Sequence, residues 1–414
     1  MMPMSRITLL PDRFFDSLTG EMVEARAIVI ADGRVEAVVD SGSARDAIHL
    51  IGQTIVPGLI DVHTHLTGPE DEGQGYAHLV MRSGAQDALI GVKHAAATLR
   101  AGFTTVRDIG TFRAFVDVAL KEAVEGGWVE GPRMKVAGAY VTCPGGGGDI
   151  TGLAVDVDGV LPRELRFGVT SGVDQMRSTV RQILRYGADF IKVLATGAVL
   201  TSGTNPGAPE FTEDELRAAV EVASGAGTHV AVHGHGAEGI KRAVRAGARS
   251  IEHGSLIDDE GIELMAERGT YLVADLYDGD HILGEGPRRG FSEEVMRKTE
   301  MTTEAQRTGF RKAVEAGVRI AYGTDSGVYP HGDNGRQFAL YVEHGLSPAA
   351  SLQSATRWAA ELMGWEDRVG SLQPGLFADL VVLDDDPLDH IATLERPSGV
   401  MKSGTWVVEP APQR

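Results

Sequence analysis

Polar residues stand at the ends of several short apolar segments of this 414-residue chain. They are His63, His65, Lys192, His233, His253 and Asp325. His63 and His65 are two residues apart, so on a strand their side chains point the same way and can bind one ion. Imidazole and carboxylate groups are ligands for zinc and other divalent metals. A structural role explains one histidine at a strand end, but it explains this repeated placement poorly. We therefore predict a metal site.

Lys192 lies within the segment FIKVLATG and needs a separate interpretation. By itself, a buried lysine can form a Schiff base or act as a general base. Beside two divalent ions, however, an ammonium group would be repelled. Carboxylation by CO₂ turns the lysine into an anionic carbamate that can bridge both ions. We therefore predict two divalent ions, with zinc as the expected metal, and a CO₂-derived carbamate on Lys192.

A local pattern recurs along the chain: a helix-like segment, then a glycine, then a short apolar strand. It appears at 99–108, 184–193, 223–233, 244–254, 266–276 and 314–325. Each glycine is expected to end its helix in the left-handed conformation. One helix start is also clear, because Thr212 followed by Glu215 predicts a capping box.

Two further strands, within 56–65 and 132–138, bring the number of expected parallel strands to eight. Eight consecutive strand–helix units predict an α/β fold of the (β/α)8 TIM-barrel type. Such barrels carry their active sites at the carboxyl ends of the strands, where the polar residues above are found. The alternative is an open doubly wound sheet, but no GxGxxG loop follows the first strand.

The two ends of the chain have β character without helix signals. Residues 1–55 contain alternating apolar segments joined by an Asp-Gly turn, and residues 370–414 repeat this character. We expect a small β-sandwich domain built from both termini. The barrel, at 56–369, would be inserted between its two parts.

Composition limits the partners and the environment. The formal net charge is −19, from 39 basic and 58 acidic residues, which keeps a protein in solution and repels nucleic acids and anionic membranes. Cys143 is the one cysteine, so neither an intrachain disulfide nor a cysteine zinc cluster is expected. No signal-peptide pattern and no apolar run of about 18 residues is present. We expect a cytoplasmic protein, and a homo-oligomer stays open.

Taken together, the motifs DVHTH, FIKVLATG, AVHGHG, IEHG and GTDSG resemble those of the amidohydrolase superfamily, and occur in its order. The length and the segment KVLATGAVLTSG are similar to a branch of binuclear metal-dependent dipeptidases and carboxypeptidases related to imidazolonepropionase. The resemblance implies one metal bound by His63, His65 and Asp325. It implies a second metal bound by His233 and His253, with carboxylated Lys192 as the bridge.

Substrate contacts are less clear from the sequence. His235 either orients a ligand or is a hydrogen-bonded loop residue, and Tyr277 resembles a substrate-contacting tyrosine of the branch or is a packed aromatic. Many family members have a histidine-containing loop where this chain reads TCPGGGGD at 142–149. Its four glycines form either a mobile loop or a flexible connection. No Lys-Ser/Thr pair follows them, so nucleotide binding is not expected.

The resulting prediction is an enzyme that hydrolyses an amide C–N bond through a metal-bridging hydroxide. The expected substrate is a small molecule, a dipeptide or an N-acyl amino acid cleaved at its C-terminal residue. Asp325 would move the proton from the attacking water to the leaving nitrogen. Acidic residues near the barrel loops favour a neutral or cationic C-terminal residue. Alternatives are a cyclic amide or imidazolone hydrolase, a lactone or organophosphate ester hydrolase, and a non-catalytic scaffold.

Overall fold

The strand–helix repeats form two parallel sheets. In this computed structural model, which describes residues 6–24, 26–44, 46–70 and 76–411, every expected barrel strand is present. The three-stranded sheet has the order β6 (Leu59–Thr64), β7 (Phe103–Asp108), β8 (Arg133–Val136). The six-stranded sheet has the order β14 (Arg319–Ile320), β13 (Tyr271–Val273), β12 (Ser250–Leu256), β11 (Val230–Gly236), β10 (Ile191–Leu194), β9 (Tyr140–Val141). The sequence pattern did not predict β9.

Backbone hydrogen bonds connect the edges of these two sheets. On one side the Val62 amide donates to the Tyr322 carbonyl at 2.9 Å, and the His65 amide donates to the Ser326 carbonyl at 2.8 Å. On the other side the Asp189 amide donates to the Val136 carbonyl at 2.8 Å. The arrangement is α/β and TIM-barrel-like, although the strand ladders form two sheets and no single closed one.

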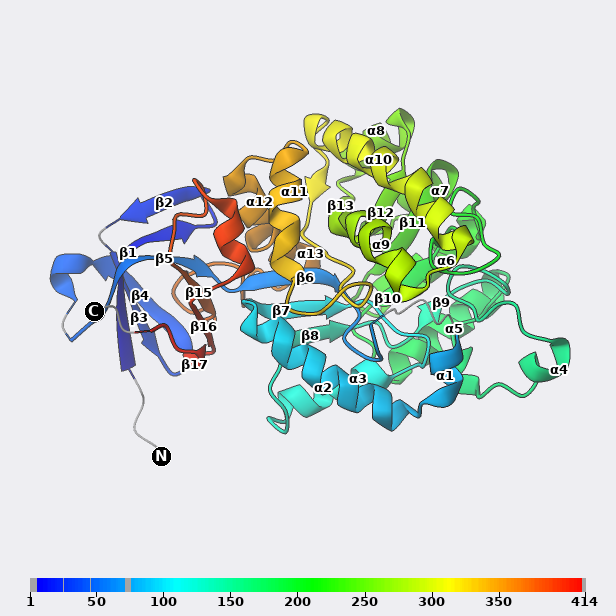
Figure 1. Cartoon of the computed structure of the whole chain (residues 1–414), viewed down its shortest axis with the longest axis horizontal. Helices are drawn as coiled ribbons and strands as arrows, with labels where there is room; N and C mark the ends of the chain where they lie inside the picture. Colours follow the sequence, from blue (N-terminus) through cyan, green and yellow to red (C-terminus); the bar gives the residue numbers. More distant parts are fainter. Residues whose placement is uncertain (1–5, 25, 45, 71–75, 412–414) are drawn as a thin grey trace.

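Helices surround these sheets on the outside (Figure 1). Their bounds are α1 (Ala77–Met81), α2 (Gly84–Arg100), α3 (Val116–Glu125), α4 (Val155–Asp158), α5 (Val173–Arg185), α6 (Glu213–Gly225), α7 (Ala237–Ala246), α8 (Asp259–Arg268), α9 (Leu276–Arg289), α10 (Glu293–Glu315), α11 (Gln337–Glu343), α12 (Pro348–Ser354) and α13 (Arg357–Met363). The predicted capping box at Thr212 and Glu215 is confirmed at the start of α6. Gly247 ends α7 with φ 99°, as expected for a left-handed helix end. None of the helices in the described ranges is long and apolar enough to cross a membrane.

Strands from both ends of the chain lie side by side in a separate sheet, at the left of Figure 1. It contains β1 (Arg6–Asp16), β2 (Glu21–Glu24), β3 (Arg26–Ala31), β4 (Arg34–Asp40), β5 (Ile48–Pro57), β15 (Leu380–Leu383), β16 (Gly399–Lys402) and β17 (Thr405–Val408). β5 pairs antiparallel with β15 and so joins the two terminal segments. The strands form one hydrogen-bonded sheet, so the two sheets expected of a β-sandwich are not confirmed.

An ion pair in the interior connects the two parallel sheets. Arg107 on β7 and Glu252 on β12 are both fully buried, and Arg107 Nη2 donates to Glu252 Oε1 at 2.8 Å. Arg107 also donates to the Val62 carbonyl on β6 at 2.6 Å and to the Ser250 hydroxyl at 3.2 Å. With these bonds the guanidinium and the carboxylate satisfy each other where no water can reach them.

Removing one partner of this pair should destabilise the fold. Arg107→Met leaves the Glu252 carboxylate buried without its counter-ion, and we expect the free energy of unfolding to fall by about 3–5 kcal/mol. Urea unfolding followed by circular dichroism measures the change. Arg100→Met is the control, because the Arg100–Glu130 pair is exposed and should contribute less than about 1 kcal/mol. Equal unfolding midpoints for the two variants would contradict this account of the interior.

Candidate active site

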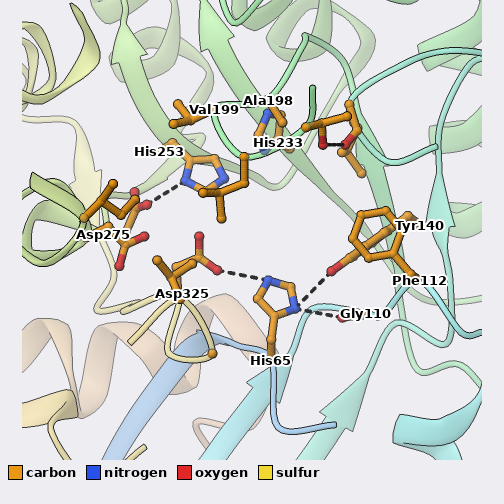
Figure 2. Close-up of a pocket in the computed structure, with 18 of the residues that line it drawn as sticks. His65, Gly110, Phe112, Tyr140, Ala198, Val199, His233, His253, Asp275 and Asp325 are labelled. Atoms are coloured by element: carbon orange, nitrogen blue, oxygen red, sulfur yellow. Dashed lines mark hydrogen bonds and ion pairs between the residues drawn. The ribbon is translucent and has the colours of Figure 1, made fainter. Parts of the chain in front are cut away.

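A cavity of about 540 Å³ opens where the barrel strands end. All six residues predicted as metal ligands line it, together with His235. They come from positions on or just after β6, β10, β11, β12 and β14, which the fold brings to one place. Figure 2 shows His65, His233, His253 and Asp325 around the same space. His63 and Asp325, 262 positions apart in the sequence, therefore belong to one cluster.

One group of possible ligands is centred on Asp325. Its Oδ1 atom lies 3.3 Å from His63 Nε2 and 3.0 Å from His65 Nε2. Burial is the largest single influence and lowers the pKa of His63, but the carboxylates of Asp325 and Glu252 together raise this pKa to about 9. Burial raises the pKa of Asp325, whereas His63 and His65 hold it well below its usual range. These three side chains offer ligand atoms within 4.8 Å of one another, a spacing that a single cation could occupy.

A second group consists of His233, His235 and His253, whose ligand atoms also lie within 4.8 Å of one another. The ring of His233 is 4.6 Å from that of His235 and 4.5 Å from that of His253, between centroids. Burial, followed by the charge of His253, lowers the pKa of His233 well below its usual value and that of His235 to about 3. Both rings therefore stay neutral, as a metal ligand must. His235 lies within β11 and not in a loop, and its ring belongs to this group of possible ligands.

The amine of Lys192 lines the same cavity and is buried. Within the described residues its Nζ atom has no hydrogen-bond partner. Burial lowers the pKa of Lys192 to about 8, although Glu252 and Asp325 act in the opposite direction. A lysine with this pKa has a substantial uncharged fraction near neutral pH, and an uncharged amine can react with CO₂. An orphaned amine among imidazole and carboxylate groups thus fits a carbamate that bridges two cations.

Hydrogen bonds on the outer side fix the orientation of three of the imidazoles. The pairs are His63 Nδ1 with Glu252 Oε2 (3.0 Å), His65 Nδ1 with the Gly110 carbonyl (2.8 Å) and His253 Nδ1 with Asp275 Oδ2 (2.8 Å). In each pair Nδ1 donates to an oxygen atom, so Nε2 is the nitrogen that a metal ion could bind. Partners of this kind orient metal-binding histidines and increase their basicity.

Backbone strain is concentrated in the same cluster. His253 and Asp325 have φ values of 68° and 55°, in the left-handed region that non-glycine residues rarely adopt. Such a conformation costs on the order of 1–3 kcal/mol and persists only where neighbouring contacts impose it. Gln306 donates to the His253 carbonyl at 3.2 Å, and the Asp325 amide donates to the His63 carbonyl at 2.8 Å. Strain retained in this way is typical of functional sites.

Two other features that the sequence singled out are Tyr277 and the glycine-rich segment at 142–149. Tyr277 is in the first turn of α9, and its ring packs against Tyr329 with 4.9 Å between centroids. It is not among the residues that line the cavity, so the structure gives it a packing contact there. In the glycine-rich segment, Gly147 lines the cavity and its amide donates to Glu210 at 2.8 Å. This segment is therefore anchored to a neighbouring loop by a carboxylate.

The sequence pattern missed several residues that complete the site. Arg107 and Glu252 are charged residues within the buried strand segments FTTVRD and SIEHGSL, so the sequence did contain a signal for them. Tyr140 places its hydroxyl 3.2 Å from His65 Nδ1 and lies on β9, the strand that the pattern did not predict. No local signal identified it.

Comparison with known proteins finds similar chains over nearly the whole length of this one. Ochratoxinase of Aspergillus niger is 30% identical over 401 residues, covering 92% of this chain and 82% of that protein. The crystal structure of a Xaa-Pro dipeptidase with bound methionine in its active site is 34% identical, with a TM-score of 0.90, covering 97% of this chain and 99% of that one. Imidazolonepropionase of Streptomyces coelicolor is 24% identical over 404 residues, covering 93% of this chain and 91% of that protein. The pattern of the amidohydrolase family matches residues 54–407, and the chain belongs to that family.

Proposed function

We propose that this hydrolase uses two divalent metal ions to cleave the amide C–N bond of a dipeptide or N-acyl amino acid at its C-terminal residue. One observation carries the proposal: two groups of ligand atoms and the unpartnered Lys192 amine line a single cavity. The similarity to a Xaa-Pro dipeptidase and to ochratoxinase supports the type of bond. Imidazolonepropionase, more distant in sequence, keeps a cyclic amide as the second candidate substrate.

The residues present fit two ions. His63, His65 and Asp325 would hold one, and His233 and His253 would hold the other, with a carbamate on Lys192 as the bridge and zinc as the expected metal. When bound, two such ions would supply Lewis acidity and a hydroxide nucleophile at neutral pH. His235 is the third imidazole of this second group and would orient the ligands of the second ion.

Asp325 would carry the proton in this reaction. An amine leaves only after its nitrogen has gained a proton, so the site needs a group that accepts a proton and returns it. The Asp325 carboxylate lies in the cavity, and His63 and His65 keep its pKa low, so it is ionised near neutral pH. The strained backbone at Asp325 would hold the carboxylate in position for both transfers.

We also infer that the two parallel sheets belong to one (β/α)8 barrel at 56–369. The hydrogen bonds between their edges, near Val62 and near Asp189, support this. Residues 1–55 and 370–414 would then form one separate domain, a β-sandwich if further contacts divide its sheet into two layers.

The purified protein should contain close to two divalent ions per chain by elemental analysis. Lys192→Ala should lose both metal and activity, because it removes the bridging carbamate, and short carboxylic acids should restore part of the activity. Lys93→Ala is the matched control, since Lys93 is an exposed lysine on α2. Full metal content and normal turnover in Lys192→Ala would show that this lysine is not a bridge.

Asp325→Asn keeps the shape of the side chain but removes the proton acceptor. We expect kcat on an amide substrate to fall by on the order of 10²-fold or more, as loss of a general acid–base group implies. Metal content must be measured in the same preparation, so that loss of a ligand is separated from loss of the proton carrier. An unchanged kcat would move the proton transfer to another residue, with His235 as the first candidate.

The charge of the cavity should decide which dipeptides are cleaved. Among the described residues that line it, four are aspartates, and Lys192 is the one lysine or arginine. We expect kcat/KM for Ala-Glu to be about 10–100-fold below that for Ala-Arg or Ala-Leu, because outside the proposed metal and carbamate groups the acidic side chains of the lining are aspartates that repel a glutamate. Steady-state assays at low and high salt, with Ala-Pro included, test this. Equal rates for Ala-Glu and Ala-Arg would refute the charge argument.

Hydrolysis of a cyclic amide or a lactone, with no dipeptide or N-acyl amino acid cleaved, would replace the proposed substrate class. The metal site itself would then stand.

A further inference from the structure

Tyr140 brings a hydroxyl group to the wall of the cavity. It lies on β9, where the register of the parallel pair places it beside Lys192 of β10, and the side chains of such neighbours point to the same face of a sheet. Figure 2 shows its hydroxyl directed toward His65 and the space between the possible ligands. The side chain is therefore part of the site, although it is not among the predicted metal ligands.

Neighbouring groups fix the ring that carries this hydroxyl. The rings of Phe112 and His65 pack against it in T-shaped contacts, with 5.2 Å and 6.0 Å between centroids. Gly110 has no side chain, and a Cβ atom there would lie 3.1 Å from two ring carbons of Tyr140. The chain thus leaves room for the aromatic ring and holds it in one place. A donor that is fixed before the substrate arrives loses little entropy on binding.

The hydrogen atom of the Tyr140 hydroxyl has no acceptor among the described residues. The oxygen lies 3.2 Å from His65 Nδ1, but Nδ1 is also 2.8 Å from the Gly110 carbonyl. A carbonyl oxygen only accepts, so Nδ1 carries the hydrogen of that bond and cannot accept another from the phenol. Tyr140 can therefore only accept from His65, and its own hydrogen is available to a group in the cavity.

Tyr76, the second tyrosine of the described lining, provides a contrast. Its ring also packs against Phe112 in a T-shaped contact, with 5.7 Å between centroids. Its hydroxyl, however, donates to the Asp149 carbonyl at 2.9 Å, so the hydrogen is already used within the protein. Of these two similar side chains, Tyr140 is the one that can offer its hydrogen to a ligand.

We propose that the Tyr140 hydroxyl donates a hydrogen bond to the C-terminal carboxylate of the substrate and so makes the enzyme specific for a free C-terminal acid. This rests on the proposed amide hydrolysis and names a group that recognises its substrate. Among the described lining residues Lys192 is the one lysine or arginine, and the proposed carbamate removes its positive charge. A carboxylate in this cavity therefore depends on neutral donors and on the metal ions. Hydrogen bonds to a charged acceptor are stronger than those between neutral groups.

The position of the hydroxyl favours the carboxylate over the scissile carbonyl. A metal ion would bind His65 through Nε2, whereas the hydroxyl lies beside Nδ1, and these two nitrogens point away from each other across the ring. The bond to be cleaved would lie near the ion. The carboxylate carbon is three bonds farther along, about 3–4 Å from the scissile carbonyl carbon by standard bond lengths. The hydroxyl is thus displaced from the reacting carbonyl, as a group that binds the carboxylate has to be.

The alternative is that Tyr140 only orients His65. This imidazole already has the Gly110 carbonyl as its hydrogen-bond partner. In that role, loss of the hydroxyl would change the metal content or slow every substrate equally. The carboxylate-binding role affects only substrates that carry a free C-terminal carboxylate, so a matched pair of substrates separates the two.

The test compares Ala-Leu with Ala-Leu amide, in which a neutral carboxamide replaces the carboxylate. The metal-loaded wild-type enzyme should prefer Ala-Leu. Tyr140→Phe removes only the hydroxyl and should lower kcat/KM for Ala-Leu about 10–100-fold, mainly by raising KM, because it removes a hydrogen bond to a charged acceptor. It should leave Ala-Leu amide nearly unchanged. Tyr76→Phe is the matched control and should change neither substrate. Metal content and melting temperature of both variants should match the wild type.

Calorimetric binding of leucine, the product that carries the carboxylate, gives a readout independent of turnover. Tyr140→Phe should bind leucine more weakly than the wild type does, and leucinamide equally. The proposal is overturned if the variant slows both substrates equally, if it loses metal, or if the wild-type enzyme does not distinguish Ala-Leu from its amide; amide hydrolysis then still stands. If neither substrate is cleaved, the proposed function fails. Weaker leucine binding by Tyr140→Phe would then still support the carboxylate subsite, and equal binding would overturn it as well.

Discussion

The buried ion pair between Arg107 and Glu252 connects the fold to the candidate active site. One oxygen of Glu252 accepts a hydrogen bond from the guanidinium of Arg107, and the other oxygen is 3.0 Å from His63 Nδ1. Burial would raise the pKa of Glu252, but Arg107 and then His63 hold it well below its usual range. The carboxylate is thus always charged, and it keeps a proton on Nδ1 of His63. A bond that holds two sheets together also selects the imidazole nitrogen that faces the cavity.

Asp61, a buried residue of β6, has a similar role. Its carboxylate accepts from the Thr324 hydroxyl at 2.5 Å, from the Asn334 amide group at 2.8 Å and from the backbone amide of His63 at 3.1 Å. Asp61 therefore connects the backbone at His63 to the segment that contains Asp325. Because Asp325 has a left-handed backbone, it needs such external fixing. Two buried carboxylates, outside the predicted ligand set, impose the geometry of that set.

The positions of the strands and of the six predicted ligand residues could be read from the sequence because both follow a local period. Gly247 at the end of α7 and Thr212 at the start of α6 show that a single residue type can indicate where a helix ends or begins. Long-range features left no such trace. β14 ends after Ile320, five residues before Asp325, because the backbone there turns to partners outside the strand ladder: the Tyr322 amide donates to the Ser354 carbonyl at 3.0 Å. Partners of Glu252 and the packing of Tyr277 likewise depend on residues far away in the sequence.

Several polar atoms of the cavity lining make no hydrogen bond within the described residues, among them Lys192 Nζ, Asp87 Oδ1 and Asp278 Oδ1. For Lys192, the proposed reaction with CO₂ would complete the group and would give it two cations to bind. Unpaired buried groups lower stability, and a fold keeps them where binding recovers that free energy. On our proposal, the cavity would therefore be least stable when it holds neither the two ions nor the carbamate.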